Sequence, residues 1–318
     1  MSTTLSKDEL LSALKAAGDQ TRLRLLVLLS RAEHNVKDLT EIMGQSQPRL
    51  SRHLKLLTGA GLIERFQEGS WVYYRIARDG APAALVTKLL TAANPADKTF
   101  NKDRQQADKV MAARAGEAQA YFKTHAKDWD SIRSLYIREE LVEDEMETLL
   151  GDTQVEKLID LGTGTGRILE RFHHLFKTGI GIDINKEMLR HARARLDRLS
   201  ITSCELRHGD ITNLPLEDNL ADTVIMHQIL HFFAEPKHAC IEAARLLKTG
   251  GRLLIVDFAP HKQEQLRVNF AHQRLGFSED QLWQFLKGTG LKGLAFKRLP
   301  STTTQENALD VSLWLASK

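Results

Sequence analysis

The feature that most constrains the fold of this 318-residue chain is a glycine-rich turn directly after a strand-like run. Residues 155–161 have the pattern of a buried strand, the chain continues Gly-Thr-Gly-Thr-Gly, and a helical pattern follows over 167–172. Glycines let the backbone approach a ligand closely at the N-terminus of a helix. The pattern therefore predicts a strand, a tight loop and a helix in a parallel α/β sheet that binds a nucleoside.

Two kinds of nucleoside cofactor compete for this loop. Dinucleotide-binding loops are spaced GxGxxG, whereas this loop is spaced GxGxG and directly follows Asp160-Leu161. The next apolar run ends in Asp183, where an acidic side chain can hold ribose hydroxyls. The spacing favours S-adenosylmethionine (SAM) or its product S-adenosylhomocysteine (SAH), which contain no pyrophosphate. An NAD-linked enzyme is the weaker alternative.

Further motifs follow in an order that suits a SAM-binding sheet. A His-Gly-Asp-Ile run over 208–211 is placed to bring Asp210 to an adenine amino group. Residues 222–226 have the pattern of a fourth strand, and 245–258 that of a helix, a Gly-Gly turn and a fifth strand. We expect residues 291–318 to supply the last two strands.

With these motifs in order, residues 150–260 resemble the class I SAM-dependent methyltransferases, close to their ubiquinone-biosynthesis-like branch. The resemblance implies that the loop after Asp160 flanks the methionine part of the cofactor and that Asp183 takes the ribose. It also implies that Asp210 and Ile211 take the adenine. The candidate cofactor-binding residues are Asp160, Gly162, Gly164, Gly166, Asp183, Ile184, Asp210, Ile211, His227 and Gln228.

The catalytic residues are less clearly marked. Methyl transfer is an in-line displacement from a sulfonium, and it runs on proximity alone when the acceptor is already nucleophilic. A hydroxyl or acidic C–H acceptor needs a base, for which His227, His231 and His261 are the candidates near strand ends. Ordinary structural roles are the alternative. Cys204 and Cys240 lie in separate elements, which argues against thiol chemistry on arsenic, and no metal site is expected.

The first 80 residues have a different pattern, that of short helices followed by two strands. A short helix is expected to end at Gly44, and Ser46 is suited to cap the next one. Two strands are expected near 62–66 and 71–76. A helix, a tight turn, a second helix and a strand pair are the arrangement of a winged helix-turn-helix.

The helix after Ser46 would bury Leu50, Leu54 and Leu57 and leave a polar face outside. Its surroundings are basic, with six Lys or Arg against two Glu between positions 45 and 78, which favours a polyanion partner. The major groove of DNA admits such a helix. A small helical domain with a solvated basic face is the alternative. The candidate DNA-binding residues are Gln47, Arg49, Ser51, Arg52, His53, Lys55, Arg65 and Arg75.

Residues 5–80 resemble the ArsR-type (ArsR/SmtB) bacterial repressors. The resemblance lies in TRLRLL at 21–26, SQPRLSRHLKLL at 46–57, AGLI at 60–63 and GSWVYYRI at 69–76. It implies a homodimer that binds double-stranded, palindromic operator DNA. Metal-sensing members place cysteines before the reading helix, where this chain has Asn35 and Lys37 and no thiol. Soft-metal sensing is therefore not expected.

The sequence thus predicts an α+β winged helix-turn-helix domain over 1–80 and a helical dimerisation and linker region over 81–150. An α/β Rossmann-like class I methyltransferase domain is expected over 151–318. No apolar run is long enough to span a membrane, so no membrane partner is expected, and the charged start of the chain is unlike a signal peptide. Together with the presence of only two cysteines, these features predict a cytoplasmic protein.

The predicted function is a transcriptional regulator in which SAM or SAH binds the second domain and changes operator affinity. The alternative is an active methyltransferase that acts on a small-molecule acceptor and is autoregulated by its attached repressor domain. An acceptor site with an aligned base would favour the alternative.

Overall fold

The computed structural model describes all of the 318 residues except 1–3, 69–70, 126–138, 153 and 302–308. The chain divides into two compact units, Met1–Arg114 and Ala115–Lys318. The expected division into three parts, with boundaries at 80 and 150, stays a prediction.

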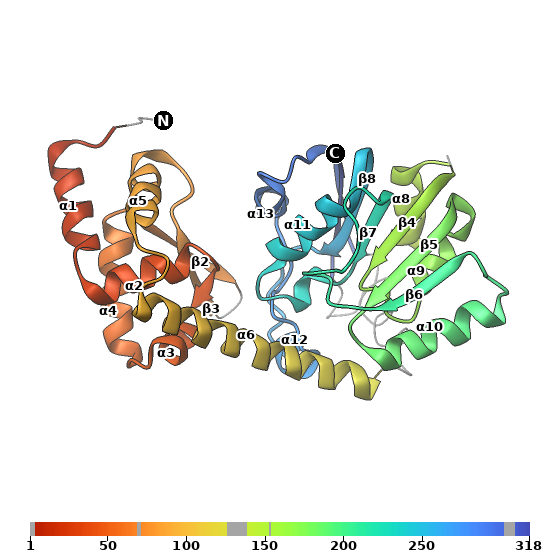
Figure 1. The fold of residues 1–318 in the computed structure, drawn as a ribbon, viewed down its shortest axis with the longest axis horizontal. Helices are drawn as coiled ribbons and strands as arrows, with labels where there is room; N and C mark the ends of the chain where they lie inside the picture. The colour runs from red at the N-terminus through yellow and green to blue at the C-terminus, as the bar shows by residue number, and fades with distance from the viewer. Residues whose placement is uncertain (1–3, 69–70, 126–138, 153, 302–308) are drawn as a thin grey trace. The chain divides into compact units, whose positions relative to one another are not determined.

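The N-terminal unit is built mainly from helices (Figure 1). They are α1 (Lys7–Ala17), α2 (Gln20–Leu29), α3 (Val36–Met43), α4 (Gln47–Gly59), α5 (Gly80–Ala92) and the beginning of α6 (Lys98–His125). Helix α3 ends, as predicted, at Gly44, which has a left-handed φ of 62°. Ser46 takes the N-cap position of α4, but its side chain makes no capping hydrogen bond.

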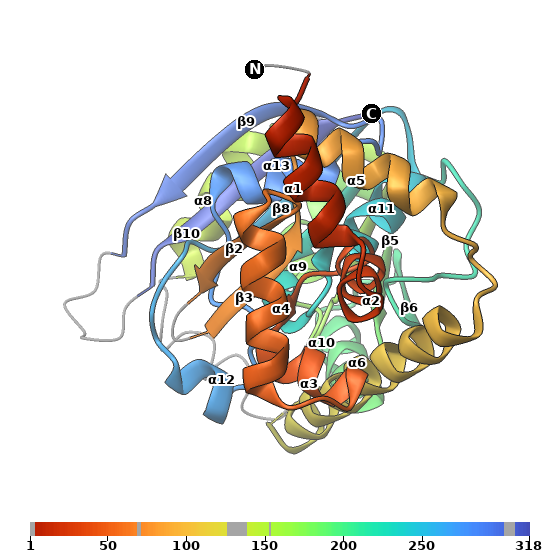
Figure 2. The same ribbon diagram turned by 90° about the vertical axis from the view of Figure 1, so that its left-hand side faces the viewer.

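Three antiparallel strands complete this unit, in the order β1-β3-β2. They are β1 (His34–Asn35), β2 (Ile63–Glu68) and β3 (Trp71–Ile76), and Figure 2 shows β2 beside α4. The pair β2–β3 lies close to where the sequence predicts it, with β2 two residues longer at its end. Strand β1 was not predicted, because two residues are too few to show an alternating pattern.

Helix α6 contributes to the core of the N-terminal unit. Ala107 and Val110 are buried in the same cluster as the leucines of α2 and α4. The guanidinium of Arg24 on α2 donates two hydrogen bonds of 2.6 Å to the carboxylate of Asp103. The first turns of α6 are therefore fixed to this unit, and the same helix runs on past the boundary at Arg114.

The C-terminal unit is built on a seven-stranded sheet in the order β6-β5-β4-β7-β8-β10-β9. Its strands are β4 (Val155–Leu161), β5 (Phe176–Asp183), β6 (Cys204–His208), β7 (Ala221–His227), β8 (Leu247–Phe258), β9 (Lys292–Leu299) and β10 (Val311–Ser317). The first five are parallel, and β10 is antiparallel to both β8 and β9. The strand order reverses between β4 and β7, and ligands of such sheets bind at the carboxyl ends beside this point.

Helices cover both faces of the sheet. They are α8 (Glu139–Leu150), α9 (Arg167–Arg171), α10 (Lys186–Arg198), α11 (Pro236–Leu246), α12 (Gln265–Asn269) and α13 (Glu279–Leu286). Successive strand residues face opposite sides. Val224 packs in the cluster that includes α11 and α13, and Ile225 packs in the cluster that includes α8 and α9. This two-sided burial explains why the inner strands β7 and β8 contain continuous apolar runs.

One expected turn is absent from the sheet. The sequence pattern predicts that Gly250-Gly251 separates a helix from a strand, but β8 runs through both residues from Leu247 to Phe258. The pairing of β8 with β7 shifts register between Ala221 and Thr223. The prediction was wrong because glycines accommodate an irregularity within a strand as readily as a turn. Among the described residues, the structure contains no helix long and apolar enough to cross a membrane.

Candidate functional site

The glycine-rich loop leaves the carboxyl end of β4 and folds over the end of β5. The backbone N–H groups of Gly162 and Thr163 both donate to the carbonyl of Ile182, at 2.8 and 2.9 Å. Gly162 has a φ of 77°, and a Cβ added there would lie 2.5 Å from Cγ1 of Ile229. Both the backbone conformation and the space therefore require glycine at this position.

Asp183, the last residue of β5, holds the loop through its carboxylate. Oδ2 accepts from the backbone N–H of Gly164 at 2.9 Å, and Oδ1 accepts from that of Asn185 at 2.7 Å. Burial raises the pKa of Asp183, and the two backbone hydrogen bonds counter part of this effect. A carboxylate has about four lone-pair sites, so Asp183 can accept further hydrogen bonds from a ligand.

Gln228 directly follows β7 and has two unusual properties. Its backbone φ is 53°, which is uncommon for a residue other than glycine. Its side-chain oxygen and nitrogen are both buried, and neither has a hydrogen-bond partner within the described part of the chain. Leaving such an amide unsatisfied costs about 1–3 kcal/mol per group. A polar ligand at the ends of β4 and β7 would remove this cost, and this is the observation that fits a bound cofactor.

The residues expected near adenine lie on the loop after β6. The backbone N–H of Gly209 donates to the carbonyl of Asp183 at 3.1 Å, which joins this loop to the end of β5. Asp210 is exposed, and its Oδ1 accepts from the backbone and the hydroxyl of Thr212 at 2.9 and 2.7 Å. Ile211 is buried. The structure thus brings Asp183, Asp210 and the glycine loop together at one edge of the sheet.

The remaining candidates at this edge differ in exposure. Asp160, the penultimate residue of β4, is buried, as is His227 at the end of β7. Ile184 is 44% exposed. Gly166 precedes α9 with a left-handed φ of 81°. These positions are compatible with the expected roles, which stay predictions.

Of the three histidines considered as bases, His231 has the most defined environment. It lies in a short 3₁₀ turn, η3 (Leu230–Phe232), and its Nδ1 is 2.7 Å from Oδ1 of Asp257. Asp257 is fully buried near the end of β8. Asp257 is not among the residues predicted from the sequence, although a carboxylate at the end of the apolar run LLIV is a signal that could have identified it.

Two more histidines are grouped with His231. The ring of His272 lies 4.2 Å from that of His231, and the ring of His261 lies 6.0 Å from that of Phe258, measured between centroids. Burial, aided by the nearby His231, lowers the pKa of His272 well below its ordinary value and that of His261 to about 4. Both imidazoles are therefore neutral near pH 7.

The N-terminal unit presents most of its candidate DNA contacts on one helix. Leu50, Leu54 and Leu57 of α4 are fully buried. The opposite side of α4 and the strand β2 expose the candidates Gln47, Arg49, Ser51, Arg52, Lys55 and Arg65. Positions three and four apart share a helix face, so the α4 residues form one polar surface.

Two candidates in this unit are engaged elsewhere. His53 is half-buried, with Nδ1 3.6 Å from the Asp19 carboxylate that caps α2. Arg75 pairs with Glu64 at 3.0 Å and Glu33 at 3.4 Å, and its guanidinium lies over the ring of Phe66. These contacts depend on long-range packing that local sequence does not reveal.

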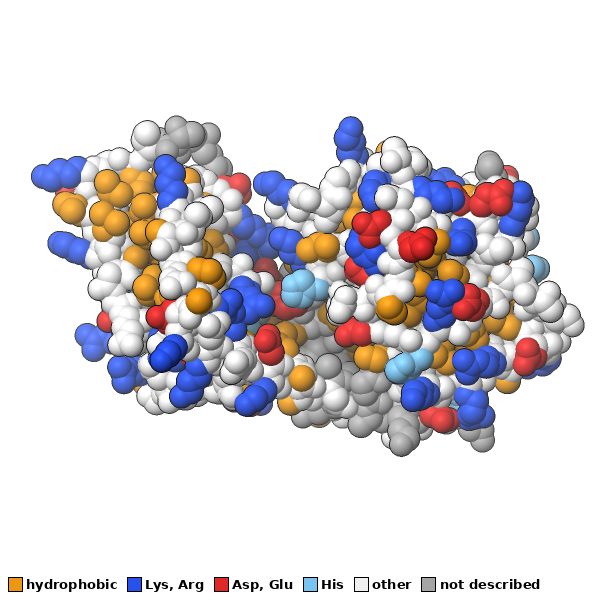
Figure 3. Space-filling view, in the orientation of Figure 1, with side chains coloured by type: hydrophobic (Ala, Val, Ile, Leu, Met, Phe, Trp, Pro, Cys, Tyr) orange, Lys and Arg blue, Asp and Glu red, His pale blue; other side chains and the backbone are white. Residues whose placement is uncertain are grey.

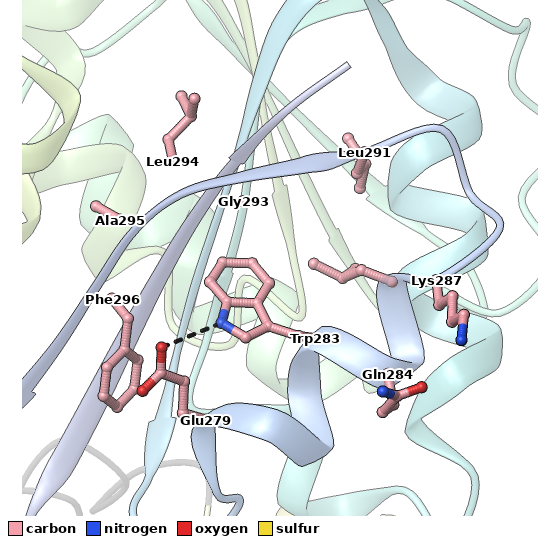
Figure 4. Close-up of a pocket in the computed structure, with 10 residues that line it drawn as sticks. Glu279, Trp283, Gln284, Lys287, Leu291, Gly293, Leu294, Ala295 and Phe296 are labelled. Carbon is pink, nitrogen blue, oxygen red and sulfur yellow. Dashed lines mark hydrogen bonds between the residues drawn. The ribbon is translucent and has the colours of Figure 1, made fainter. Parts of the chain in front are cut away.

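A separate groove lies between α13 and β9, with a volume of about 540 Å³ (Figure 4). Trp283 forms part of it, and its indole N–H donates to Glu279 at 3.4 Å, drawn as a dashed line in Figure 4. None of the residues selected from the sequence lines this groove. It is therefore distinct from the edge that carries the glycine loop.

The cysteines are not arranged for reactivity. Both are free, Cys204 on β6 and Cys240 on α11, and burial raises their pKa values to about 11 and 12. The thiolate is the reactive form, so both are unreactive near neutral pH. Within the described ranges, no three His, Cys, Asp or Glu side chains are grouped as ligands of a metal ion.

Comparisons with known proteins match the two parts separately. Residues 19–65 match the family model for bacterial regulatory proteins of the arsR family, and 159–255 match that for a methyltransferase domain. Over 64 residues the chain is 45% identical to the arsenical resistance operon repressor of Escherichia coli (strain K12), covering 20% of this chain and 55% of that protein.

The second part has its own relatives. Over 111 residues the chain is 34% identical to the demethylmenaquinone methyltransferase of Tropheryma whipplei (strain Twist), covering 35% of this chain and 45% of that protein. The chain thus spans about half the length of these two curated relatives. A solved SAM-dependent methyltransferase from Aquifex aeolicus aligns with a TM-score of 0.47 and 18% identity, covering 59% of this chain and 98% of that one.

The two family matches fall on the two parts that the structure separates. The chain therefore joins an arsR-family DNA-binding region to a methyltransferase domain of the class I fold.

Proposed function

We propose that this protein is a transcriptional regulator that binds operator DNA as a homodimer and senses SAM or SAH through its methyltransferase domain. The observation that carries this proposal is the hydrogen bond between Asp183 and the glycine loop, in a chain that also exposes the polar face of α4. A ligand site and a DNA-reading helix in one chain are the minimum that a ligand-responsive repressor needs.

The proposed DNA contacts are those that the structure leaves exposed. Helix α4 enters the major groove with Gln47, Ser51 and Arg52 towards the bases. Arg49, Lys55 and Arg65 are placed for phosphates, with β2 and β3 acting as the wing. Arg75 is assigned a structural role, because its guanidinium already pairs with Glu33 and Glu64.

The homodimer is proposed from an apolar surface on the N-terminal unit. Leu10, Leu11 and Leu14 of α1 are 38%, 43% and 43% exposed. Figure 3 shows hydrophobic side chains gathered over α1 and α5 on this face. Helices α1 and α5 pair with their counterparts in a second copy, which would cover this surface and place two α4 helices on a palindromic operator.

The residues at the carboxyl edge of the sheet suit SAM. Asp183 would hold the ribose hydroxyls, and Asp210 with Ile211 would hold the adenine. Asp160 would face the ammonium of the methionine part. When bound, SAM supplies a methyl group on a positively charged sulfur. The unsatisfied amide of Gln228 and the spare lone pairs of Asp183 support this assignment.

Sensing requires that the ligand binds the DNA-competent and DNA-incompetent states with different affinities. Helix α6 supports a connection between the two functions, because it contributes to the core of the N-terminal unit and continues into the C-terminal one. A ligand-induced structural change in the methyltransferase domain would therefore be transmitted along α6. This helix is bound to α2 through Arg24 and Asp103.

A second candidate function is an active methyltransferase that acts on a small molecule and is autoregulated by the attached repressor. The observation that favours turnover is the His231–Asp257 pair, which lies close in the chain to Gln228 and is aligned as a base. Sensing and turnover are compatible, because an enzyme that converts SAM to SAH also changes which of the two ligands it holds.

The proposal is tested by fluorescence anisotropy of a labelled duplex that carries the DNA upstream of the protein's own gene, at one fixed salt concentration. Affinity is measured with no ligand, with SAM and with SAH, because phosphate contacts make it strongly salt-dependent. We expect the dissociation constant to change at least fivefold with one ligand and not in an Asp183→Ala variant. Tight ligand binding with unchanged DNA affinity would leave turnover as the function.

A further inference from the structure

His231, Asp257, His261 and His272 form one group, the histidine cluster. It adjoins the glycine loop through the segment after β7. In that segment Ile229 occupies the space beside Gly162, and the backbone N–H of Leu230 donates to Oδ2 of Asp257 at 2.9 Å. The cluster therefore begins where the proposed SAM site ends.

Asp257 determines which nitrogen of His231 carries the proton. Its carboxylate accepts from the backbone N–H groups of Leu230, His231 and Phe258 at 2.9, 3.3 and 2.8 Å. It also lies 2.7 Å from Nδ1 of His231, which must donate to it. In a neutral imidazole the other nitrogen, Nε2, then carries a lone pair. No described group hydrogen bonds to this Nε2, so it can accept a proton.

His261 has the opposite arrangement. Its Nδ1 accepts a hydrogen bond from the backbone N–H of Gln263 at 3.2 Å, so in the neutral ring Nε2 carries the hydrogen. This Nε2 is buried and has no partner within the described residues. Nδ1 of His272, in a side chain more than nine-tenths buried, is likewise without a partner there. Groups of this kind are costly unless a ligand satisfies them.

Aromatic rings pack closely within the cluster. The ring of Phe232 lies 4.0 Å from that of His231, and the ring of Phe258 lies 4.8 Å from it. Phe258 is stacked with His272 at an interplanar angle of 25°. A ligand that contacts these rings would stack best if it were itself flat and aromatic. His261 is the least buried of the three histidines and is therefore the one most accessible to a ligand from solvent.

We propose that the histidine cluster is the methyl-acceptor site and that it takes a flat aromatic or enolic molecule with an ionisable hydroxyl. Nε2 of His231 accepts the hydroxyl proton while Asp257 stabilises the imidazolium. His261 donates a hydrogen bond to an oxygen of the acceptor. The acceptor oxygen bonds to the methyl carbon, the carbon–sulfur bond breaks, and its electron pair stays on sulfur. The products are a methyl ether, SAH and a proton that leaves His231 for solvent.

This inference rests on the proposed SAM site, so the experiment begins with calorimetry of SAH binding to the full-length protein. 4-Nitrophenol, whose visible absorption reports the phenolate, is then titrated into the SAH-loaded protein. We expect saturable binding and about a tenfold increase in the phenolate fraction of the bound probe below its own pKa, because a nearby imidazolium favours the anion. The readout does not require turnover.

Two variants and a control test which histidine causes the ionisation shift and which one binds the probe. His231→Gln is expected to abolish the ionisation shift and to retain SAH binding. His261→Leu is expected to weaken probe binding at least fivefold and to retain the shift, and it keeps the inference testable if His231→Gln does not fold. His238→Gln, which alters an exposed histidine on α11, serves as the control and is expected to behave like the unmodified protein.

The outcomes separate the two proposals. Loss of SAH binding in the unmodified protein overturns the SAM site, and the acceptor site with it. Normal SAH binding without saturable probe binding overturns the acceptor site alone. A phenolate shift that survives His231→Gln also overturns it, because another group would then be the base.

Discussion

The carboxylate of Asp183 accepts a hydrogen bond from the backbone N–H of Gly164 at 2.9 Å. This bond joins the end of β5 to the loop that leaves β4. Asp183, which is proposed to bind the ribose, therefore also fixes the loop that would surround the rest of the cofactor. Replacement of Asp183 is therefore expected to remove more than one contact.

Asp183→Ala is expected to weaken SAH binding about 10- to 100-fold, since it removes charged hydrogen bonds to the ligand and the anchor of Gly164. Isothermal titration calorimetry measures the loss. Asp197→Ala, which alters an exposed carboxylate at the end of α10, is the matched control. Unchanged affinity in Asp183→Ala would remove this residue from the site.

Arg52→Ala is expected to weaken operator binding by about 1–3 kcal/mol, because Arg52 lies on the exposed face of α4. SAH affinity is expected to stay unchanged. Anisotropy at several salt concentrations measures the DNA affinity, and Arg31→Ala provides an exposed arginine outside α4 as the control. Equal losses in both variants would indicate a general charge effect instead of a reading helix.

Leu11→Glu is expected to convert the proposed dimer to a monomer, because it places two carboxylates in an apolar interface. Sedimentation velocity measures the mass, and DNA affinity is expected to fall with it. Val268→Glu controls for the added charge, since Val268 is an 82% exposed apolar residue on α12. A dimer that persists in Leu11→Glu would place the interface elsewhere.

The stability of the methyltransferase domain is expected to fall as the pH falls from 6.5 towards 4. The pKa of His261 is lowered to about 4 by burial, so the unfolded chain binds a proton in this range that the folded one does not. At pH 5 this effect of His261 lowers the free energy of unfolding by about 2 kcal/mol. Urea unfolding of His261→Gln at pH 5 and 7 is expected to show a smaller difference than the unmodified protein. His238→Gln is expected to leave the difference unchanged.

Arg24→Leu is expected to destabilise the N-terminal unit by about 3 kcal/mol, because it leaves the carboxylate of Asp103 buried without its cation. The side chain of Asp103 is only 4% exposed. The double replacement of Arg24 and Asp103 by leucine is expected to recover most of the loss, as is common for buried ion pairs. Hydrogen exchange at α2 and α6 follows the effect locally. A double variant as unstable as the single one would contradict this reading.

The elements nearest the two proposed sites were predictable because their signals are local. The strand, loop and helix over 155–171 follow from a strand-like run and three glycines, and β4 and α9 lie there. Helix α4 follows from the spacing of Leu50, Leu54 and Leu57. In each case the periodicity and the stop signals lie within about fifteen residues of each other.

The remaining features depend on residues far apart in the chain. Asp257 acquires its role from His231, 26 positions earlier, and Arg75 is paired with Glu33, 42 positions earlier. Strand β8 runs through Gly250, whose backbone N–H donates to the carbonyl of Lys318, far along the chain. Local patterns carry no information about such partners, so side chains of the right chemical type were found while some of their partners were missed.

The contact between Gly162 and Ile229 constrains the evolution of these two positions unequally. A smaller residue at 229 would open space beside the loop, but position 162 would still require a φ of 77° and hence glycine. Position 229 can therefore accept a smaller residue, whereas position 162 cannot accept a larger one. Among homologous chains, we expect glycine to be retained at position 162 and substitutions at this contact to occur at position 229, two residues before His231.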